Sequence, residues 1–200
     1  MSPSMTEPPS TSSRRPKPIP PRPGLGAAKA RLDEILRVDH AGEVAAVQIY
    51  RAQAAVFAAA PATAELARKM DALKDQEAEH LAAFDTLLTE HGARPSLLSP
   101  VWRLAAFALG AGTALMGEKV AHACTDAVEQ VIEEHYAGQV EVLQDDEPAL
   151  AQTLSRFRDD ELKHQAEAVA EGARQAPAYP LLAAVIRAGC RAAIKTAEKI

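Results

Sequence analysis

The sequence is poor in aromatic residues and in long apolar runs, and each scarcity narrows what the protein can be. Phe, Trp and Tyr make up 4% of the 200 residues, although 48% are hydrophobic and many of those are alanine. Strands favour aromatic and β-branched side chains, so this composition favours closely packed helices instead. No apolar run reaches the roughly 20 residues that a membrane-spanning helix needs. The nearest, residues 104–117, indicates a buried or interfacial helix.

Cysteine is also scarce. Cys124 and Cys190 are the only two, and neither belongs to a CxxC pair. A rubrerythrin-like peroxidase would need a rubredoxin CxxC pair, so that class is disfavoured. Because the chain opens with no secretory signal, we predict two reduced thiols in an intracellular protein.

Positive charge is in deficit, which gives no global electrostatic case for nucleic-acid binding. The net charge of the chain is −5, whereas the first residues carry a net positive charge. Residues 1–26 hold eight of the 14 prolines together with several Arg and Lys residues. We therefore predict a disordered, proline-rich basic tail over residues 1–28 and one folded domain over 29–200. So many prolines oppose the amphipathic helix of a mitochondrial transit peptide, which favours a bacterial protein.

The rest of the chain shows helical periodicity without strand-like alternation. Apolar residues recur every three or four positions after Lys29, and the breaks "AAAPAT", "HGARP", "QDDEPA" and "APAYP" divide the chain into helices. The predicted fold class is all-α. The expected long helices run from residue 29 to the Pro61 break and over about 62–91, 119–143, 148–173 and 181–200.

A Glu-x-x-His pattern occurs twice, as Glu77 with His80 and as Glu161 with His164. Residues three apart on a helix lie on one face, so a carboxylate and an imidazole can serve one metal ion. A single occurrence is weak, because an exposed Glu–His pair on a solvated helix face is equally ordinary. Whether the pair belongs to a metal site or to a solvated helix face therefore depends on which side chains of neighbouring helices lie opposite it.

An internal repeat supplies a facing glutamate for each pair. Glu43 precedes Glu77 by 34 residues, and Glu129 precedes Glu161 by 32. The midpoints of both intervals fall at helix breaks, so each glutamate should face its Glu-x-x-His pair across an antiparallel hairpin. A tyrosine also follows each of these two glutamates by seven residues, at positions 50 and 136.

Two such hairpins predict a four-helix bundle with six ionisable side chains at its centre. Buried free charges of this number are too costly, whereas two divalent ions would neutralise the carboxylates and accept both imidazoles. One Glu from each of two helices and a Glu-x-x-His from each of the others is the di-iron carboxylate pattern. The lack of thiolates disfavours structural zinc. The predicted metal ligands are Glu43, Glu77, His80, Glu129, Glu161 and His164.

These residues also lie in stretches that resemble a known family, the demethoxyubiquinone hydroxylases of ubiquinone biosynthesis. The matching stretches are RVDHAGE (37–43), QEAEHL (76–81), FALGAGTALMG (107–117), HACTDAVE (122–129), EEHY (133–136), FRDDELKH (157–164) and APAYPLL…IRAGCRAAI (176–194). They cover most of residues 31–194 and leave the tail outside the resemblance.

The resemblance implies a ferritin-like di-iron monooxygenase that hydroxylates the ring of demethoxyubiquinone with O₂. It implies one iron held by Glu43, Glu77 and His80 and a second held by the corresponding residues of the other hairpin. It further implies that Glu77 and Glu161 bridge or shift between the irons, and that NADH is the reductant. A polyprenyl quinone substrate requires contact with a membrane surface, on the cytoplasmic face of a bacterial inner membrane or on the mitochondrial inner membrane. Isoprenoid length, homo-oligomers and partner proteins stay open.

Two segments suit peripheral membrane binding. Residues 97–117 are apolar with Trp102 near one end, and the last helix places a basic stripe beside apolar residues. The stripe consists of Arg187, Arg191, Lys195 and Lys199. An ordinary packing helix with a solvated basic edge is the alternative interpretation.

Several further residues are candidates for supporting roles. His135 and Tyr136 lie two turns after Glu129 and are candidates for electron or proton transfer, although a packed aromatic with a hydrogen-bonded hydroxyl is the somewhat favoured alternative for Tyr136. Asp39 and Asp126 are candidates to orient the ligand histidines, and a solvated or helix-capping aspartate is an equal alternative at both positions. The remaining histidines, at positions 40, 91 and 122, are expected at the surface or behind the ligands.

Three other functions compete with hydroxylation. A ferritin-like iron oxidase or storage protein would need neither the apolar 97–117 segment nor the basic last helix. A non-catalytic quinone- or lipid-binding bundle would need no buried carboxylate cluster. The rubrerythrin-like peroxidase is disfavoured by its missing cysteines.

Overall fold

The computed structural model describes residues 25–200 as helices and connecting turns, with no strand among them. This confirms the all-α class. The elements are α1 (Leu25–Phe57), the 3-10 helix η1 (Pro61–Thr63), α2 (Ala64–His91), α3 (Ser99–Leu115), α4 (Glu118–Leu143), α5 (Pro148–Ala170), the 3-10 helix η2 (Ala173–Gln175) and α6 (Tyr179–Ala197). None of the helices in residues 25–200 is long and apolar enough to cross a bilayer.

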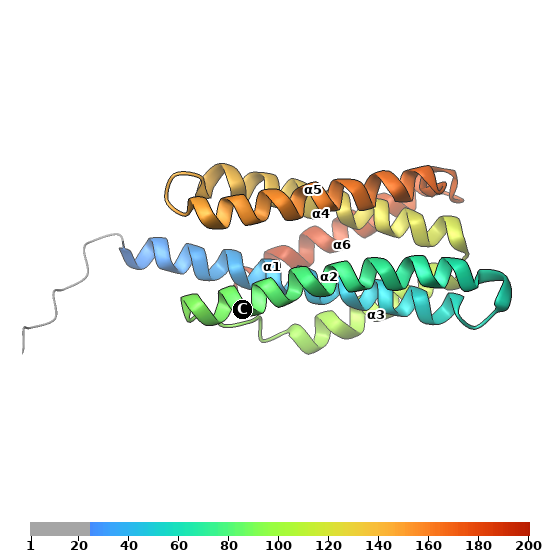
Figure 1. Cartoon of the computed structure of the whole chain (residues 1–200), viewed down its shortest axis with the longest axis horizontal. Helices are drawn as coiled ribbons and strands as arrows, with labels where there is room; N and C mark the ends of the chain where they lie inside the picture. The colour runs from blue at the N-terminus through green and yellow to red at the C-terminus, as the bar shows by residue number, and fades with distance from the viewer. Residues whose placement is uncertain (1–24) are drawn as a thin grey trace, which may run out of the picture.

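Two antiparallel hairpins, α1–α2 and α4–α5, build the bundle. Their turns lie at opposite ends of the molecule, the first at the right and the second at the left of Figure 1. Helix α3 packs along α1, and α6 packs along α4, so each hairpin has one further helix against its first member. The expected ferritin-like four-helix bundle with additional helices is therefore confirmed.

The helix ends coincide with the proline and glycine residues that were predicted to break the helices. Pro61 and Pro148 occupy first-turn positions, where a missing N–H costs nothing. Gly92 ends α2 in the left-handed conformation, with its N–H directed to the carbonyl groups of the last turn. The structure also corrects one boundary. Helix α1 begins at Leu25, four residues before the expected Lys29, while the rest of the predicted tail (residues 1–24) lies outside the described residues.

Helix α3 approaches α1 so closely that one contact point requires glycine. A Cβ atom built on Gly110 would lie 2.8 Å from the Cα of Ile49 and closer still to its carbonyl oxygen. Gly112, two residues on, would meet nothing within 4 Å. The absence of a side chain at position 110 therefore sets the distance between the two helices.

Two apolar clusters fill the bundle on either side of its middle. One gathers Leu36, Phe84, Leu154 and Phe157 with their neighbours, and the other gathers Phe57, Leu66 and Met70 with small residues of α1 and α4. Along α1, α2 and α4, the predicted metal ligands fall between residues of the two clusters. The polar centre is thus enclosed by packed apolar layers, which keep bulk water away from it.

Candidate metal centre

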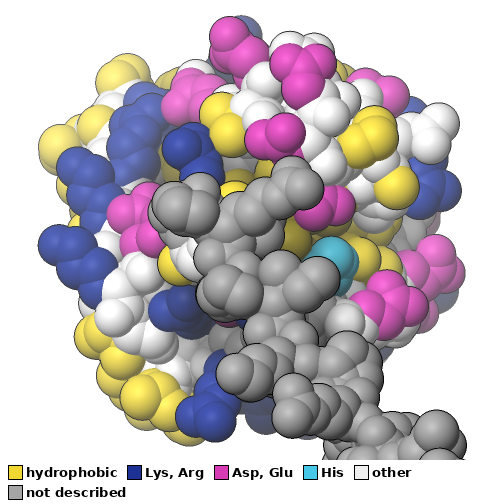
Figure 2. All heavy atoms as spheres, turned by 90° about the vertical axis from the view of Figure 1, so that its left-hand side faces the viewer, with side chains coloured by type: hydrophobic (Ala, Val, Ile, Leu, Met, Phe, Trp, Pro, Cys, Tyr) yellow, Lys and Arg dark blue, Asp and Glu magenta, His cyan; other side chains and the backbone are white. Residues whose placement is uncertain are grey.

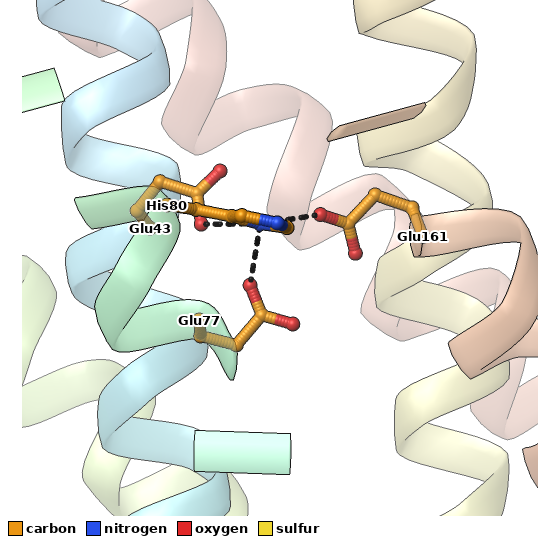
Figure 3. A group of neighbouring side chains, drawn as sticks. All are labelled: Glu43, Glu77, His80 and Glu161. Atoms are coloured by element: carbon orange, nitrogen blue, oxygen red, sulfur yellow. Dashed lines mark ion pairs between the residues drawn. The ribbon is translucent and has the colours of Figure 1, made fainter. Parts of the chain in front are cut away.

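Each helix of the four-helix bundle contributes one buried glutamate to a single cluster. Glu43, Glu77, Glu129 and Glu161 are at most 1% exposed, and the two histidines of the Glu-x-x-His pairs, on α2 and α5, are also buried. Figure 3 shows His80 with three of these carboxylates around it, one from its own helix and two from others. All six predicted ligands are therefore brought together, as the repeat requires.

The inward ring nitrogen of each histidine faces several carboxylates. His80 Nδ1 lies 3.4 Å from Glu161 Oε1, 3.5 Å from Glu77 Oε2 and 3.8 Å from Glu43 Oε2 (Figure 3). His164 Nδ1 lies 3.0 Å from Glu77 Oε1 and 3.4 Å from Glu161 Oε2. Two of the glutamates, Glu77 and Glu161, thus face both imidazoles.

The donors divide into two overlapping groups that suit a metal ion. In each group, one donor atom from every member lies within 4.8 Å of the others. The first group is Glu43, Glu77, His80 and Glu161, and the second is Glu77, Glu129, Glu161 and His164. Because Glu77 and Glu161 belong to both groups, the geometry is compatible with the bridging role implied by the resemblance.

The outward nitrogens of the two histidines are held from the opposite hairpin. His164 Nε2 lies 2.6 Å from Gln76 Oε1, and His80 Nε2 lies 3.5 Å from Asp160 Oδ2. Such contacts orient the ring so that Nδ1 faces the centre. Sequence reasoning missed both partners. The available signal was their position, since each directly precedes a glutamate of the Glu-x-x-His pattern.

The prediction that Asp39 and Asp126 orient the ligand histidines is wrong. Asp39 accepts a hydrogen bond from Gln139 Nε2 at 2.8 Å and lies 3.4 Å from His135 Nε2. Asp126 accepts hydrogen bonds from Gln165 and Tyr179. Each aspartate therefore contacts polar side chains of α4, α5 or α6, and neither aspartate forms a hydrogen bond with His80 or His164.

Two tyrosines join the hairpins at the level of the cluster. The Tyr136 hydroxyl donates to Glu43 Oε1, and the Tyr50 hydroxyl donates to Glu129 Oε1. Each tyrosine thus serves the glutamate of the other hairpin, and both are 1% exposed. Of the two predicted transfer residues, Tyr136 touches a predicted ligand, while His135 contacts Asp39 and Gln139 instead.

Burial and mutual repulsion shift the pKa values of the outer carboxylates upward. Desolvation raises the pKa of Glu43 well above its ordinary value, and the charges of Glu77 and Glu161 add to the rise. Desolvation likewise raises the pKa of Glu129, with Glu161 the next largest cause. These two side chains are therefore held as neutral acids unless a cation lies beside them.

The central groups shift in the opposite sense. Burial alone would raise the pKa of Glu77, but the neighbouring His164 and His80 lower it to about 2. Burial opposes protonation of the imidazoles, yet the surrounding carboxylates raise the pKa of His80 to about 11 and that of His164 to about 9. The cluster thus stores protons that a metal ion would displace.

The donor set fits divalent iron. Several buried atoms directed at the centre make no hydrogen bond, among them both oxygens of Glu77 and Glu161 and the Nδ1 atoms of His80 and His164. Unsatisfied buried carboxylate and imidazole atoms are costly, and coordination would satisfy them. Carboxylate and imidazole donors without thiolate suit iron or manganese better than structural zinc.

An apolar cavity of about 390 Å³ adjoins one side of the cluster. It lies among α1, α3, α4 and α6 and is walled by alanines and branched aliphatic side chains, together with Trp102 and Cys190. Its polar lining includes Glu43, Tyr136, His135 and Asp39. A hydrophobic molecule in the cavity would therefore touch the cluster from the Glu43 side.

The remaining histidines and cysteines have varied environments. His40 is buried and lies 3.1 Å from Asp85 Oδ1, and His122 is buried near Glu118 and Glu171, so neither is a surface group. Both cysteines are free thiols, as predicted. Burial raises the pKa of Cys124 to about 12, which keeps that thiol protonated.

The fold and the buried cluster define the class, a helix-bundle protein with a carboxylate and histidine centre. Residues 30–197 match the family model described as "Ubiquinone biosynthesis protein COQ7", so the chain belongs to that family. The resemblance found in the sequence is thereby confirmed.

Curated relatives agree with this assignment. The "3-demethoxyubiquinol 3-hydroxylase" of Rhodospirillum rubrum is 49% identical over 178 residues, which cover 89% of this chain and 82% of that protein. The mouse "NADPH-dependent 3-demethoxyubiquinone 3-hydroxylase, mitochondrial" is 44% identical and covers 86% and 79% of the two chains. The yeast "5-demethoxyubiquinone hydroxylase, mitochondrial" is 39% identical over 87% and 80%. The relatives are thus hydroxylases, as expected, and none of these three names describes iron storage.

Proposed function

We propose that this protein hydroxylates the ring of a demethoxyubiquinone with O₂ as a di-iron monooxygenase of ubiquinone biosynthesis. One observation carries the proposal: two overlapping groups of metal donors lie beside an apolar cavity that reaches Glu43. The names of the relatives supply the substrate class. An iron-storage protein has no use for such a cavity, and a quinone carrier has no use for the donors.

The six predicted ligands are proposed to hold two irons. Glu43 and His80 would serve one ion, Glu129 and His164 the other, and Glu77 with Glu161 would be shared, in keeping with the two donor groups. When bound, a pair of ferrous ions supplies the electrons that activate O₂ for insertion into the ring.

The protein itself positions the ring and controls protons. The aliphatic walls of the cavity exclude water and hold the ring beside Glu43. The Tyr136 hydroxyl fixes Glu43 through its hydrogen bond and places a proton at Oε1. His135 shares the same cavity, and Asp39 and Gln139 hold it in place. His135 and Tyr136 are thus proposed to pass protons or electrons between the ring and the centre.

Turnover also requires a reductant. The sequence resemblance implies NADH, whereas the name of the mouse relative specifies NADPH. The proposal is accordingly a reduced nicotinamide nucleotide, and both nucleotides belong in the assay. The sequence has no glycine-rich dinucleotide fingerprint, and residues 25–200 contain no strand that could precede one.

An exposed apolar surface on the two helices that line the cavity, here called the apolar rim, supports contact with a membrane surface. Large apolar side chains on and beside α3 and on α6 are exposed: Leu97, Val101, Leu104, Leu115, Met116, Leu181 and Val185. Because α3 and α6 also line the cavity, a polyprenyl tail leaving the cavity would meet this apolar rim.

The basic stripe on the last helix is only half available for anionic lipid. Arg191 forms an ion pair of 2.9 Å with Glu134, and Arg187 donates to Gln130, so these two bind α4. Lys195 and Lys199 remain exposed. At the end of the molecule seen in Figure 2, most basic side chains lie at the left and most acidic ones at the top and right, although each side carries some of both. Peripheral binding at the cytoplasmic face of a bacterial inner membrane, or at the mitochondrial inner membrane in a eukaryote, rests on this asymmetry and the apolar rim.

Vesicle co-sedimentation tests the membrane proposal. Wild type should pellet with anionic vesicles, and Leu104→Glu with Leu181→Glu should not, because both substitutions place charge on the exposed rim. Equal pelleting of the two proteins would contradict a role for this surface.

The central experiment combines iron content with oxygen-dependent hydroxylation. Protein loaded with Fe(II) without oxygen should hold about two irons per chain at the central cluster, as in di-iron carboxylate bundles. With a short-chain demethoxyubiquinone analogue, NADH or NADPH and ¹⁸O-labelled O₂, it should yield a labelled hydroxylated quinone. Glu161→Ala should lose most of the central iron and the product. Iron without product would favour storage or oxidation, and no iron would refute the metal centre.

A further inference from the structure

We propose that Glu118, His122 and Glu171 form a second metal site, which binds a divalent transition-metal ion at one end of the α4–α5 hairpin. One donor atom from each residue lies within 4.8 Å of the donor atoms of the other two. None of the three belongs to the central donor groups, so the proposal stands or falls independently of the hydroxylase function.

The helices place these residues on the ligand-bearing side of the hairpin. Glu118 and His122 are one turn apart on α4, and His122 is two turns before Glu129. Glu171 directly follows α5 and is two turns beyond His164. If two residues face each other in antiparallel helices, the residue seven positions before the first also faces the residue seven positions after the second. The outer cluster thus repeats the register of the central one, two turns nearer the end of the bundle.

The state of His122 points to a missing ligand. Its side chain is buried, with 4% exposure, and its Nε2 atom makes no hydrogen bond. A buried nitrogen without a partner is costly in a native protein, and a bound ion would satisfy it. Burial also lowers the pKa of His122, which keeps the imidazole in the neutral form that binds metals.

The other hairpin shows that the fold does not require polar groups at these positions. Subtracting 86 residues on α4, the interval between Glu43 and Glu129, relates Glu118 and His122 to Leu32 and Leu36. Subtracting 84 on α5, the interval between Glu77 and Glu161, relates Glu171 to position 87, also leucine. Those leucines pack into an apolar cluster at the equivalent place. One hairpin is closed there by leucines, whereas the other carries three metal donors.

The chemistry of the donors selects the kind of ion. One imidazole and two carboxylates suit zinc, manganese or ferrous iron, and the imidazole disfavours magnesium and calcium. Both carboxylates lie at the surface, so an ion can reach the site from solvent. Lys69 Nζ lies 2.6 Å from Glu171 Oε1 and competes with the ion for that carboxylate.

Zinc binding to the metal-free full-length chain tests the proposal. In equilibrium dialysis with Zn²⁺, wild type should bind one more ion per chain than His122→Gln does. If the variant still binds the outer ion, its affinity for that ion should be at least tenfold lower than that of wild type. Glu171→Gln, a surface change that spares the fold, should have the same effect. His91→Gln is the matched control and should bind as wild type. Lys69→Met should bind the outer ion several-fold more tightly, because Glu171 loses its competitor.

Two further measurements place the ion. A variant with Glu77→Ala and Glu161→Ala should retain the outer ion after losing the central ones, which separates the two sites. Anomalous scattering from crystals soaked in Zn²⁺ should show a peak among Glu118, His122 and Glu171. If His122→Gln and Glu171→Gln bind as many ions as wild type with unchanged affinity, the site does not exist.

Discussion

The two hairpins present nearly the same residues to the centre but differ in what lies behind them. Tyr136 and Glu43 border the apolar cavity, whereas the equivalent pair, Tyr50 and Glu129, does not line it. Tyr50 instead packs with Phe57 and Met70 in an apolar cluster. The repeat therefore builds a symmetric donor set with access from one side.

The asymmetry comes from the helices outside the four-helix bundle. Helices α3 and α6 both border the cavity, and α3 also approaches α1 closely at Gly110. The same two helices carry the exposed apolar rim. Under the proposed function, the centre would act on its substrate from one side, because Glu43 lines the cavity and the similar Glu129 does not.

The largest expected effect comes from the glutamates shared by both donor groups. Glu77→Ala and Glu161→Ala should each remove most bound iron and lower hydroxylation by more than about a hundredfold, since loss of an outer partner alone costs 10- to 100-fold in metal affinity. Glu43→Ala and Glu129→Ala should retain part of the iron, because each contributes to one group only. Metal analysis after anaerobic loading distinguishes these outcomes. Equal iron loss in all four variants would contradict the shared role.

The next effect concerns the contact that brings α3 to α1. Gly110→Ala should destabilise the protein by about 1 to 3 kcal/mol, because the new methyl group meets the Ile49 backbone. Gly112→Ala is the matched control and should be neutral or stabilising by about 0.5 to 1 kcal/mol, since its Cβ meets nothing. Denaturant unfolding measures both. Equal stabilities would mean that α3 moves away from α1 without cost.

Filling the cavity should impair substrate binding without removing iron. Ala193 lines the cavity and its neighbour Ala192 does not, so Ala193→Phe should raise KM for the quinone about tenfold while Ala192→Phe should not. A tenfold change corresponds to about 1.4 kcal/mol. Steady-state kinetics with iron analysis of both variants provides the measurement. An unchanged KM in Ala193→Phe would place the substrate elsewhere.

The two tyrosines test whether the open side of the centre is the reactive side. Tyr136→Phe should lower kcat by a few-fold up to about tenfold with iron content unchanged, since it removes the hydroxyl at Glu43 beside the cavity. Tyr50→Phe removes the equivalent hydroxyl on the closed side and should have the smaller effect on kcat. Full turnover in Tyr136→Phe at normal iron content would show that this tyrosine is only a packing residue.

The smallest expected effect is a pH dependence of stability caused by His40, which is not a member of the central donor groups. Burial lowers the pKa of His40 below its ordinary 6.5, although Asp85 opposes the shift. The unfolded chain then binds the proton more readily, so this group costs stability as pH falls below about 6.5 toward the folded pKa. His40→Gln should flatten this part of the stability profile. Urea unfolding of both proteins between about pH 5 and 7 tests the sign. Parallel profiles would contradict it.

Some features followed from the sequence because they depend on local spacing. Helical periodicity and proline breaks located the helices to within a few residues, and the Glu-x-x-His pattern with its mirrored glutamates identified all six members of the cluster. A helix has a fixed rise and twist, so residues three apart share a face wherever the helix lies. An antiparallel hairpin likewise pairs residues by their distance from the turn.

Only the tertiary structure decided how the hairpins meet. Gln76 and Asp160 hold the histidines, and each tyrosine serves the opposite glutamate, because side chains more than 75 residues apart become neighbours. The cavity beside Glu43 and the contact at Gly110 likewise depend on how α3 and α6 pack. Such contacts arise from the interlocking of whole helix surfaces, which no local pattern encodes. The sequence by itself determined which residues form the centre, and the packing of the added helices determined on which side of it the cavity lies.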